Sequence, residues 1–320
     1  MKTLLAIAIT LAITAPARAQ SDYPTRTVRI IIGFGAGAAA DTPGRLLAQK
    51  FTAALGQQFV VENRPGAGSN IAAEHVARAP KDGHTLFMGT AANTQNVSIS
   101  PNLTFDFAKD FAPIALVAAV PNILVAHPTL GVEKVADLVA LAKQKPGEIM
   151  FGSSGVGTST HLAGELLNVM AGIKLVHVPY PGSAQAITDV LTGRIPLLFA
   201  PASAVIQHVE KGNLKALAST QLKRAGIAPA VPTMSEAGLP GFQAVSWIGL
   251  MGPAGMPKDI VERLSSEMVK IMAEPAFRQR LLDAGAEPVG SSAAEFAAHM
   301  KAEIERWEPV VKAAGLYRMN

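Results

Sequence analysis

The segment Arg29–Arg45, which reads RIIIGFGAGAAADTPGR, constrains the fold of this 320-residue chain more than any other stretch. The apolar run Val28–Ile32 predicts a strand that is buried on both faces. The run ends in the glycine-rich loop Gly33–Gly37, and Asp41–Pro43 then supplies a helix N-cap and an early helical proline. A strand, a glycine loop and a helix in this order leave backbone N–H groups free at the positive end of a helix dipole, which is a candidate anion site.

Three interpretations of this loop stay open when it is taken by itself. It could hold a pyrophosphate, it could hold a carboxylate, or it could be a tight turn with no ligand. The first would make the protein an NAD-dependent enzyme that uses Gly33–Ala38, because this stretch matches the pattern G-x-G-x-x-A and a strand ends in Glu62, a possible ribose ligand. The glutamate lies farther from the glycines than the roughly 20 residues that this pattern expects, and such an enzyme would be unusual outside the cytoplasm.

The chain beyond this helix continues to alternate strands with helices. Strands are expected at Gln58–Glu62 and His84–Gly89, and each is followed by a polar loop, at Asn63–Asn70 and Thr90–Asn96. This alternation is typical of a parallel α/β sheet, whose ligands bind beyond the carboxyl ends of the strands. We therefore expect all three loops to lie at one edge of the sheet.

The second half of the chain follows the same logic without any sequence repeat of fixed period. The strand Ile149–Phe151 leads into the Gly/Ser-rich loop Gly152–Thr160 and a helix over 161–170. A later strand leads into the loop Pro179–Ser183 and another helix. A second α/β unit is therefore predicted, again with a loop and a helix start at the end of a strand.

Two apolar segments are expected to connect the two units. Phe111–Ala126 is interrupted by Pro113 and Pro121 and is predicted to run from the first unit into the second. Val245–Gly252 is predicted to be the strand that returns. Amphipathic helices over 258–313 are expected to cover the outside of the first unit.

The N-terminus carries the features of a secretory signal peptide over residues 1–19. Lys2 gives a short positive region, Leu4–Ala15 an apolar region, and Ala17–Ala19 a cleavage site of the A-x-A type. We expect cleavage after Ala19 and an exported mature protein, since no later stretch is long and apolar enough to span a membrane. The chain has no cysteine, which excludes thiolate nucleophiles and cysteine metal sites.

Composition and motifs argue against several other classes of function. The formal net charge of +4 is spread without a basic block, which disfavours nucleic acid as a partner. The seven histidines form neither H-x-x-x-H nor H-E-x-x-H, so no metal site is predicted. Gly152–Gly155 is not the G-x-S-x-G of serine hydrolases, and no carboxylate pair suggests acid–base catalysis.

Two anion-type loops, one in each half, suggest instead that the halves close on a small anionic solute. Backbone N–H groups and the hydroxyls of Ser153, Ser154, Thr158 and Thr90 would bind it, and no arginine would be required. Each hydroxyl taken singly could equally be a cap or turn residue.

Five motifs spread over the chain are specific when taken together. They are Ile32–Asp41, Val61–Gly68 (VENRPGAG), Phe151–Ala163 (FGSSGVGTSTHLA), Val231–Phe242 (VPTMSEAGLPGF), and Tyr180–Gly182 (YPG) with Asp189 and Gly193. By these motifs the chain, from about Tyr23 to Gly315, resembles the substrate-binding proteins of tripartite tricarboxylate transporters, the Bordetella-uptake-gene (Bug) or TctC family.

The resemblance implies a periplasmic binding protein-like α/β fold, with two α/β domains joined by hinge strands and the ligand cleft between them. It implies domain I over 20–121 and 238–320, and domain II over 122–237. Such proteins capture a small carboxylate and deliver it to a membrane permease without catalysis. We therefore expect a monomeric periplasmic protein that binds a dicarboxylate, tricarboxylate or aromatic acid, with no cofactor and no metal. An exported sensor subunit that reports to a receptor is the alternative.

The resemblance also implies which residues bind the ligand. Two loops supply the carboxylate site, through backbone groups and ordered water, and two further loops complete its walls. The expected ligand-binding residues are Phe34, Gly35, Ala36, Gly37, Asp41, Thr90, Ala91, Asn93, Ser153, Ser154, Gly155, Thr158, His161, Tyr180, Gly182, Ser183 and Ala202.

Three departures from the family pattern bear on the ligand. Ala38 replaces the second glycine of a common pair, which adds a methyl group near the site. Ile195-Pro196 stands where a Val-Asp pair is common. Phe199 is followed by Ala200-Pro201, where an aspartate often faces an amino group of the ligand. This last departure favours a plain or aromatic carboxylate over an amino acid.

Overall fold

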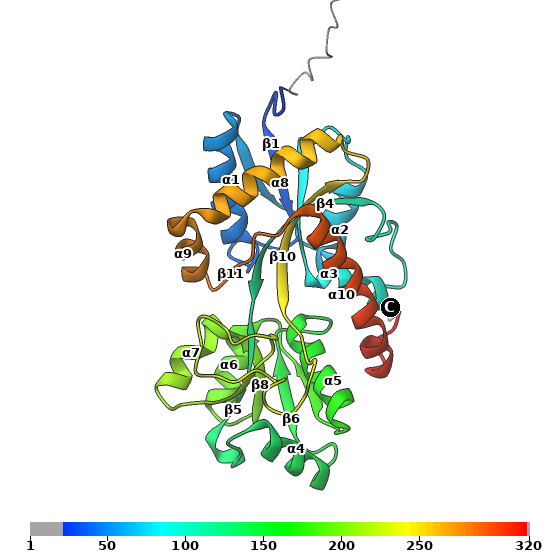
Figure 1. Ribbon diagram of the computed structural model, residues 1–320. Helices are drawn as coiled ribbons and strands as arrows, with labels where there is room; N and C mark the ends of the chain where they lie inside the picture. Colours follow the sequence, from blue (N-terminus) through cyan, green and yellow to red (C-terminus); the bar gives the residue numbers. More distant parts are fainter. Residues whose placement is uncertain (1–21, 319–320) are drawn as a thin grey trace, which may run out of the picture.

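The computed structural model describes residues 22–318, which form a mixed α/β fold in two lobes (Figure 1). One lobe is built on a six-stranded sheet and the other on a five-stranded sheet. The α/β class with two units that the sequence predicts is confirmed. The predicted signal peptide lies outside the described residues.

The first sheet has the strand order β11-β4-β10-β3-β1-β2. Strands β1, β2 and β3 are parallel, whereas β10 runs antiparallel to both β3 and β4. The apolar run that predicts β1 is buried on both faces as expected, because helices cover the sheet on both sides. The strands are β1 (Val28–Ile32), β2 (Phe59–Asn63), β3 (Thr85–Thr90), β4 (Phe111–Val120), β10 (Ser246–Pro253) and β11 (Glu287–Pro288).

The second sheet has the order β7-β6-β8-β5-β9 and comes from one continuous part of the chain. Strands β6, β7 and β8 are parallel, and β5 runs antiparallel to β8 and β9. The strands are β5 (Asn122–Ala126), β6 (Met150–Ser153), β7 (Val176–Pro179), β8 (Leu197–Pro201) and β9 (Lys215–Ser219).

Helices follow most of the parallel strands, and the last three pack around the first sheet. They are α1 (Asp41–Leu55), α2 (Asn70–Ala77), α3 (Ala91–Ile99), α4 (Val135–Gln144), α5 (Ser159–Ala171), α6 (Ser183–Leu191), α7 (Ala202–Glu210), α8 (Lys258–Ala273), α9 (Pro275–Asp283) and α10 (Ala293–Ala313). The polar loop expected at Thr90–Asn96 is wrong, because β3 passes directly into α3 at Thr90. Asn93 is buried there, so tertiary packing overrides its weak helix propensity.

Two segments cross between the lobes side by side. The expected strand Phe111–Ala126 is two strands, β4 and β5, which belong to different sheets and are separated by Pro121. The returning segment bonds to this crossing: the Thr220 N–H donates to the Asn122 carbonyl at 3.0 Å, and the Ala244 N–H donates to the Thr220 carbonyl at 3.0 Å. Because β10 then enters the first sheet between β3 and β4, both crossings are anchored in that sheet.

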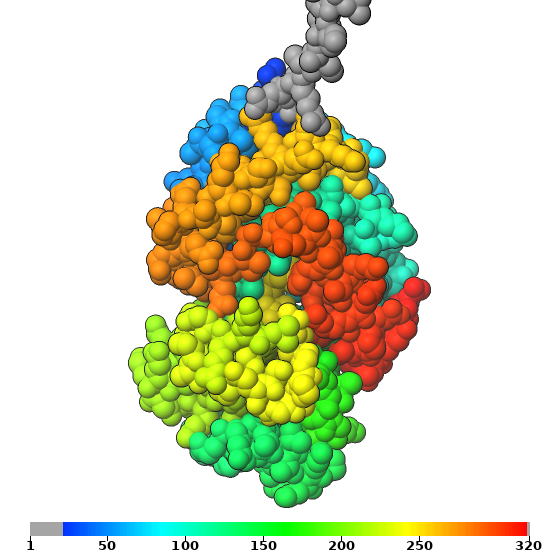
Figure 2. Space-filling model, in the orientation of Figure 1, coloured from blue at the N-terminus to red at the C-terminus, as the bar shows by residue number. Residues whose placement is uncertain are grey.

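Helix α10 provides a third connection between the lobes, and Figure 1 shows it running from the first lobe down toward the second. It lies against α3 and β4 in the first lobe and against α5 in the second. Near its C-terminal end, Trp307 is fully buried in the core that also contains Leu162 and Phe242. Figure 2 shows α10 as the red band that reaches past the waist between the lobes. Among residues 22–318, no helix is long and apolar enough to cross a membrane.

Candidate functional site

A cavity of about 550 Å³ lies between the two sheets and takes its walls from both lobes. Among residues 22–318, none of those that line it has a charged side chain. The first lobe contributes Phe34, Gly37, Ala38, Ala39, Ala40, Thr90, Ala92, Val120, Ser246 and Ile248, and the second contributes Asn122, Ser154, Thr158, Ser159, Thr160, Pro181, Gly182, Ser183 and Pro201.

Five helices begin at this cavity, because their first residues or N-caps line it. Ala40 precedes α1, Thr90 precedes α3, Thr158 caps α5, Gly182 precedes α6 and Pro201 precedes α7. The first N–H groups of each helix lack intrahelical acceptors, and the helix dipole places partial positive charge there. The cavity is therefore suited to an anion even though it contains no basic side chain.

Asp41 does not line the cavity, but it hydrogen-bonds to the glycine loop Gly33–Gly37 on the side away from the cavity. Its Oδ2 accepts hydrogen bonds from the Gly37 N–H at 3.0 Å and from Arg45 at 3.1 Å, and its Oδ1 accepts one from Asn63 at 2.9 Å. Burial would raise the pKa of Asp41, but these hydrogen bonds outweigh it and hold the pKa below its ordinary value. Asp41 is thus an ionised residue that shapes the loop.

In the second-lobe loop Gly152–Thr160, three hydroxyls form a chain of hydrogen bonds whose donors and acceptors can be assigned. Thr158 donates to the Gly155 carbonyl at 2.7 Å and so has no further hydrogen to give. In its 2.9 Å contact with Thr160, Thr160 must therefore be the donor, and in the 2.9 Å contact between Ser154 and Thr160, Ser154 must donate. Ser154 begins the chain, and its O–H can turn to a ligand without breaking the bonds between the other two.

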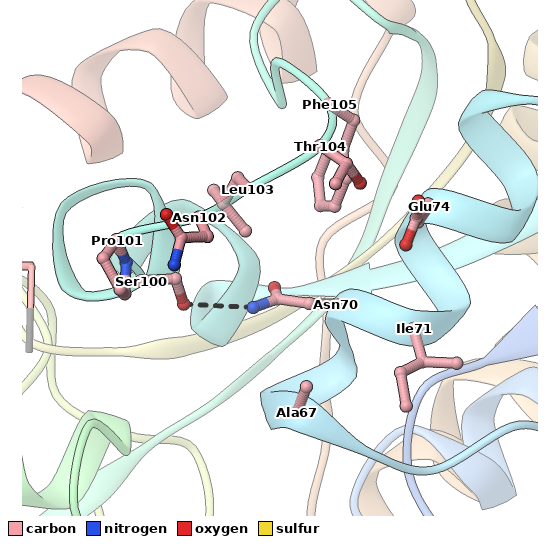
Figure 3. Close-up of a pocket in the computed structure, with 10 residues that line it drawn as sticks. All are labelled: Ala67, Asn70, Ile71, Glu74, Ser100, Pro101, Asn102, Leu103, Thr104 and Phe105. Carbon is pink, nitrogen blue, oxygen red and sulfur yellow. Dashed lines mark hydrogen bonds between the residues drawn. The ribbon is translucent and has the colours of Figure 1, made fainter. Parts of the chain in front are cut away.

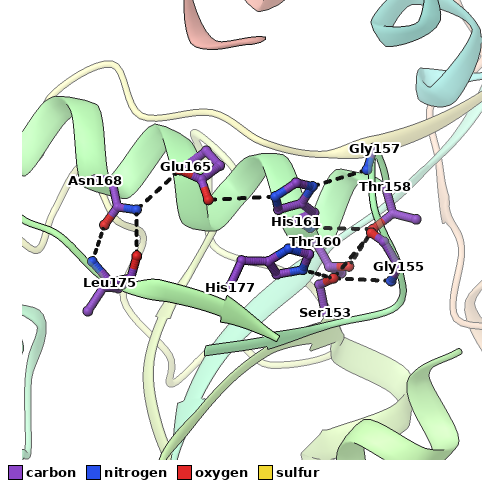
Figure 4. Close-up of polar contacts among 10 residues, drawn as sticks. All are labelled: Ser153, Gly155, Gly157, Thr158, Thr160, His161, Glu165, Asn168, Leu175 and His177. Carbon is purple, nitrogen blue, oxygen red and sulfur yellow. Dashed lines mark hydrogen bonds and ion pairs between the residues drawn. The ribbon is translucent and has the colours of Figure 1, made fainter. Parts of the chain in front are cut away.

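Two histidines support this loop (Figure 4). His161 is buried, and its Nδ1 accepts the Gly157 N–H at 3.0 Å, while its Nε2 faces Glu165 at 3.6 Å. His177 contacts the Ser153 hydroxyl through Nε2 at 2.6 Å. Burial, with a smaller contribution from His161, lowers the pKa of His177 to about 4. His177 therefore serves the loop as a neutral ring near pH 7.

The structure brings some of the expected ligand residues to the cavity wall and leaves others behind it. Seven line it: Phe34, Gly37, Thr90, Ser154, Thr158, Gly182 and Ser183. The other ten do not, although they lie in or next to the same loops: Gly35, Ala36, Asp41, Ala91, Asn93, Ser153, Gly155, His161, Tyr180 and Ala202. Contact of any of them with a ligand stays a prediction.

Two of the residues behind the wall have clear structural roles. The Tyr180 hydroxyl donates to Asp189 at 2.8 Å, and burial together with this bond raises the pKa of the phenol to about 12. Ala202 is fully buried as the first residue of α7. Sequence reasoning placed Ala38, Ala39, Ala40, Ala92, Ser159, Thr160 and Pro181 in the expected loops without naming them as ligand-binding residues, and it missed Val120, Asn122, Pro201, Ser246 and Ile248. Four of these lie on the crossing strands. The only sequence signal for them was the prediction that these strands pass between the two units.

Other hollows lie away from the space between the lobes. One of about 460 Å³ is lined by the start of α2 and by residues 100–105 (Figure 3). There Asn70 donates a hydrogen bond to Ser100 at 3.1 Å, which ties the two segments together. Among residues 22–318, no group of three or more histidine, aspartate or glutamate side chains is placed to hold a metal ion.

Comparisons with known proteins agree with this geometry. Residues 44–316 match the family described as the tripartite tricarboxylate transporter family receptor, TctC. The chain is 33% identical to Protein BugT of Bordetella pertussis, over 96% of this chain and 94% of that protein.

Two solved structures with bound acids are similar to this chain. R. palustris Rpa4515, solved with adipate, shares 38% identity with a TM-score of 0.78, and the match covers 92% of this chain and 99% of that one. MatC of Rhodopseudomonas palustris, solved with bound malate, shares 31% identity with a TM-score of 0.75, over 90% of this chain and 100% of that one.

Proposed function

Because the chain belongs to the TctC family of tripartite tricarboxylate transporter receptors, we propose that it captures a small carboxylate between its lobes and delivers it to a membrane permease. The family and its solved members are solute-binding receptors and not enzymes, which removes the NAD-dependent alternative. In this proposal the protein acts in the periplasm as a monomer, with residues 20–121 and 238–320 as domain I and residues 122–237 as domain II.

One observation carries the ligand class. Helix starts from both lobes open into a cavity whose lining, within the part of the chain that the structure describes, has no charged side chain, so the attraction for an anion comes from backbone N–H groups. A carboxylate can accept several such hydrogen bonds at once, and the hydroxyl of Ser154 is placed to add another. The adipate and malate bound to the two similar proteins are both carboxylates, which supports the same class here.

Closure of the lobes would couple binding to delivery. A ligand that touches both walls stabilises the state in which the walls are close, because only that state provides both sets of contacts. The two crossing segments, which Thr220 links by bonding to Asn122 on one and to Ala244 on the other, are the places where the chain can bend. A permease could then distinguish the closed, loaded protein from the open one.

The test is a thermal unfolding screen on the chain that lacks residues 1–19. Mono-, di- and tricarboxylates, aromatic acids, amino acids and NAD would each be added. A ligand at about 100 times its Kd adds roughly 2.7 kcal/mol to the free energy of unfolding. At about 2–4 °C per kcal/mol for a chain of this size, the midpoint should rise clearly. The proposal would be contradicted if the midpoint rises only with NAD, or if none of the acids raises it.

Small-angle scattering with and without the best ligand would test closure. We expect the radius of gyration to decrease when the ligand is bound. Delivery would be tested by uptake of the labelled acid into vesicles that contain a tripartite permease, with and without this protein. Uptake that does not depend on the protein would remove the transport role while leaving the binding role intact.

A further inference from the structure

The carboxylate of Glu287 joins the two lobes outside the cavity. Glu287 belongs to β11, at the edge of the first sheet, and it accepts two hydrogen bonds from the second lobe. The Gln221 amide donates to its Oε2 at 3.0 Å, and the Gly226 N–H donates to its Oε1. The segment that carries these donors is part of the second lobe, because Ala225 packs in the same core as Val205 of α7.

A second contact between the lobes lies next to this one. Ser203, the second residue of α7, packs against Gly285 just before β11, so closely that a Cβ on Gly285 would collide with the Ser203 side chain. Figure 2 shows orange atoms of the first lobe against yellow-green atoms of the second at the waist. The rear contact, as we call it, consists of Ser203, Gln221, Gly226, Gly285 and Glu287. None of these five described residues lines the cavity.

The strand orders place the rear contact and the cavity on opposite sides of the crossing strands. In the first sheet, β11 lies outside β4 and β10, whereas the cavity residues follow β3 and β1 on the other side. In the second sheet, Gln221 follows β9, which lies outside β5, whereas the cavity residues follow β8, β6 and β7. A rotation about the crossing strands that brings the cavity walls together therefore moves the two halves of the rear contact apart.

We propose that the rear contact stabilises the open protein, and that Glu287 thereby sets the affinity for the ligand from outside the cavity. A contact that exists only in the open state must be broken when a ligand closes the lobes. In a protein that is mostly open without ligand, a factor that disfavours the open state therefore appears as the same factor in affinity. This inference rests on the proposed function, since it concerns ligand binding in the same cavity.

The chemistry of the rear contact suits bonds that form and break. Glu287 and Gln221 are partly exposed, and Gly226 is exposed, so water can replace their hydrogen bonds when the lobes separate. Hydrogen bonds to a charged carboxylate are stronger than those between neutral groups, but exposure to water reduces their net value. We expect their loss to change the affinity by about threefold to tenfold.

Titration calorimetry measures this effect, with adipate and malate as the probes. Glu287→Ala should bind the acid about threefold to tenfold more tightly than the wild-type chain. Ser203→Leu places bulk against Gly285, which holds the rear contact apart, and it should also tighten binding. A residue that only supports the fold would weaken binding when it is replaced, so a gain in affinity is specific to the proposed role.

The chain offers matched controls for both variants. Glu133 is an exposed glutamate whose partner Lys215 lies in the same lobe, so Glu133→Gln should leave the affinity unchanged. Ser203→Ala adds no bulk and should also leave it unchanged. Gln221→Ala should tighten binding by part of the effect, and it should add nothing when Glu287→Ala is already present.

Distances in the protein without ligand give a second readout. Because the chain has no cysteine, spin labels can be attached specifically at Thr42→Cys and Gln185→Cys. Both residues are exposed in the first turns of α1 and α6, which begin at the cavity in opposite lobes. Double electron–electron resonance should show more of the short distance in Glu287→Ala and in Ser203→Leu than in the protein with the native residues at 203 and 287.

The outcomes separate the two proposals. If Glu287→Ala and Ser203→Leu bind the acid no more tightly than the wild-type chain, the role of the rear contact is wrong and the proposed function stands. If no carboxylate binds the wild-type chain, the proposed function is wrong. The label distances then decide the rear contact by themselves, because unchanged distances in both variants would overturn it.

Discussion

The imidazole rings of His161 and His177 are stacked, with centroids 3.6 Å apart and an angle of 14° between their planes. Each ring contacts the loop that lines the cavity, His161 at Gly157 and His177 at Ser153. Two imidazolium rings at this distance would repel each other, and a proton on Nδ1 of His161 would remove the acceptor for the Gly157 N–H. The loop therefore depends on His161 Nδ1 as an acceptor and on an uncharged His177 ring stacked against it.

The first prediction concerns acid. The folded-state pKa of His177 is lowered to about 4, below its unfolded value of about 6.5, so the unfolded chain binds more protons between these values. The destabilisation that this pKa difference causes is absent above pH 6.5. It grows as the pH falls toward 4 and reaches its full size below that pH. We expect the free energy of unfolding to drop by on the order of 2 kcal/mol across this window from His177 alone.

The measurement is denaturant unfolding of the wild-type chain and of His177→Asn at pH 7 and pH 4.5. His75 and His299 also have lowered pKa values, chiefly through burial, and contribute to the same slope in both proteins. The difference between the two slopes isolates His177. Equal slopes would show that the stacked ring is not the acid-sensitive group.

The second prediction concerns Asp41. Asp41→Ala leaves the Gly37 N–H and the Asn63 amide without their acceptor, and we expect a loss of about 1–3 kcal/mol in stability, with weaker ligand binding because the loop relaxes. Arg45→Ala is the matched control. The Arg45 side chain is 51% exposed, so losing its ion pair should cost less than about 1 kcal/mol. Equal losses in the two variants would contradict the role given to Asp41.

The third prediction separates the members of the hydroxyl chain. Ser154→Ala removes the hydroxyl that can turn to the ligand, so affinity for the carboxylate should fall about tenfold with little change in the unfolding midpoint. Thr160→Val removes the central link, which accepts both the Ser154 N–H and the Ser154 hydroxyl. It should lower both stability and affinity. Calorimetry and thermal unfolding together distinguish the two patterns.

The fourth prediction concerns a close approach in the second lobe. A Cβ at Gly164 would lie 2.1 Å from the ring of Phe151, which is fully buried and cannot move aside. Alanine normally gains about 1 kcal/mol over glycine inside a helix, so the steric cost has to exceed this gain. We expect Gly164→Ala to lose about 2 kcal/mol net. Gly35→Ala, where a Cβ meets nothing within 4 Å, should stay within about 0.5 kcal/mol by chemical denaturation.

The sequence predicted those parts of the fold that local patterns determine. The run Val28–Ile32 marks β1 because apolar periodicity acts over a few residues. The N-cap expected at Asp41 is wrong by one residue: the N-cap of α1 is Ala40, which makes no side-chain cap, and Asp41 is the first residue of the helix. Helix α3 was missed because Asn93 and Gln95 look like loop residues until tertiary contacts bury them. Gly33 shows a similar limit: a Cβ there would lie 1.9 Å from Ser69 Oγ, so packing alone already requires this glycine.

The site was predicted at the level of loops and not of side chains. Loop positions follow from the ends of strands, a rule that needs no long-range contacts. Which residues of a loop face inward depends on partners such as Asn63 behind Asp41 or Asp189 behind Tyr180, and no spacing in the sequence reveals these pairs. The residues on the crossing strands depend on how the two sheets meet, which is also a long-range property.

The position of β10 has a consequence for the order in which the protein acquires its structure. The second sheet contains only residues between 122 and 219, so its strands can pair once that continuous part of the chain is available. The first sheet stays split between β3 and β4 until residues 246–253 arrive, because β10 lies between those two strands. A chain that is cut short before residue 246 would thus leave β4 without either of its neighbours and one edge of β3 exposed to other chains, while its second lobe could already be paired.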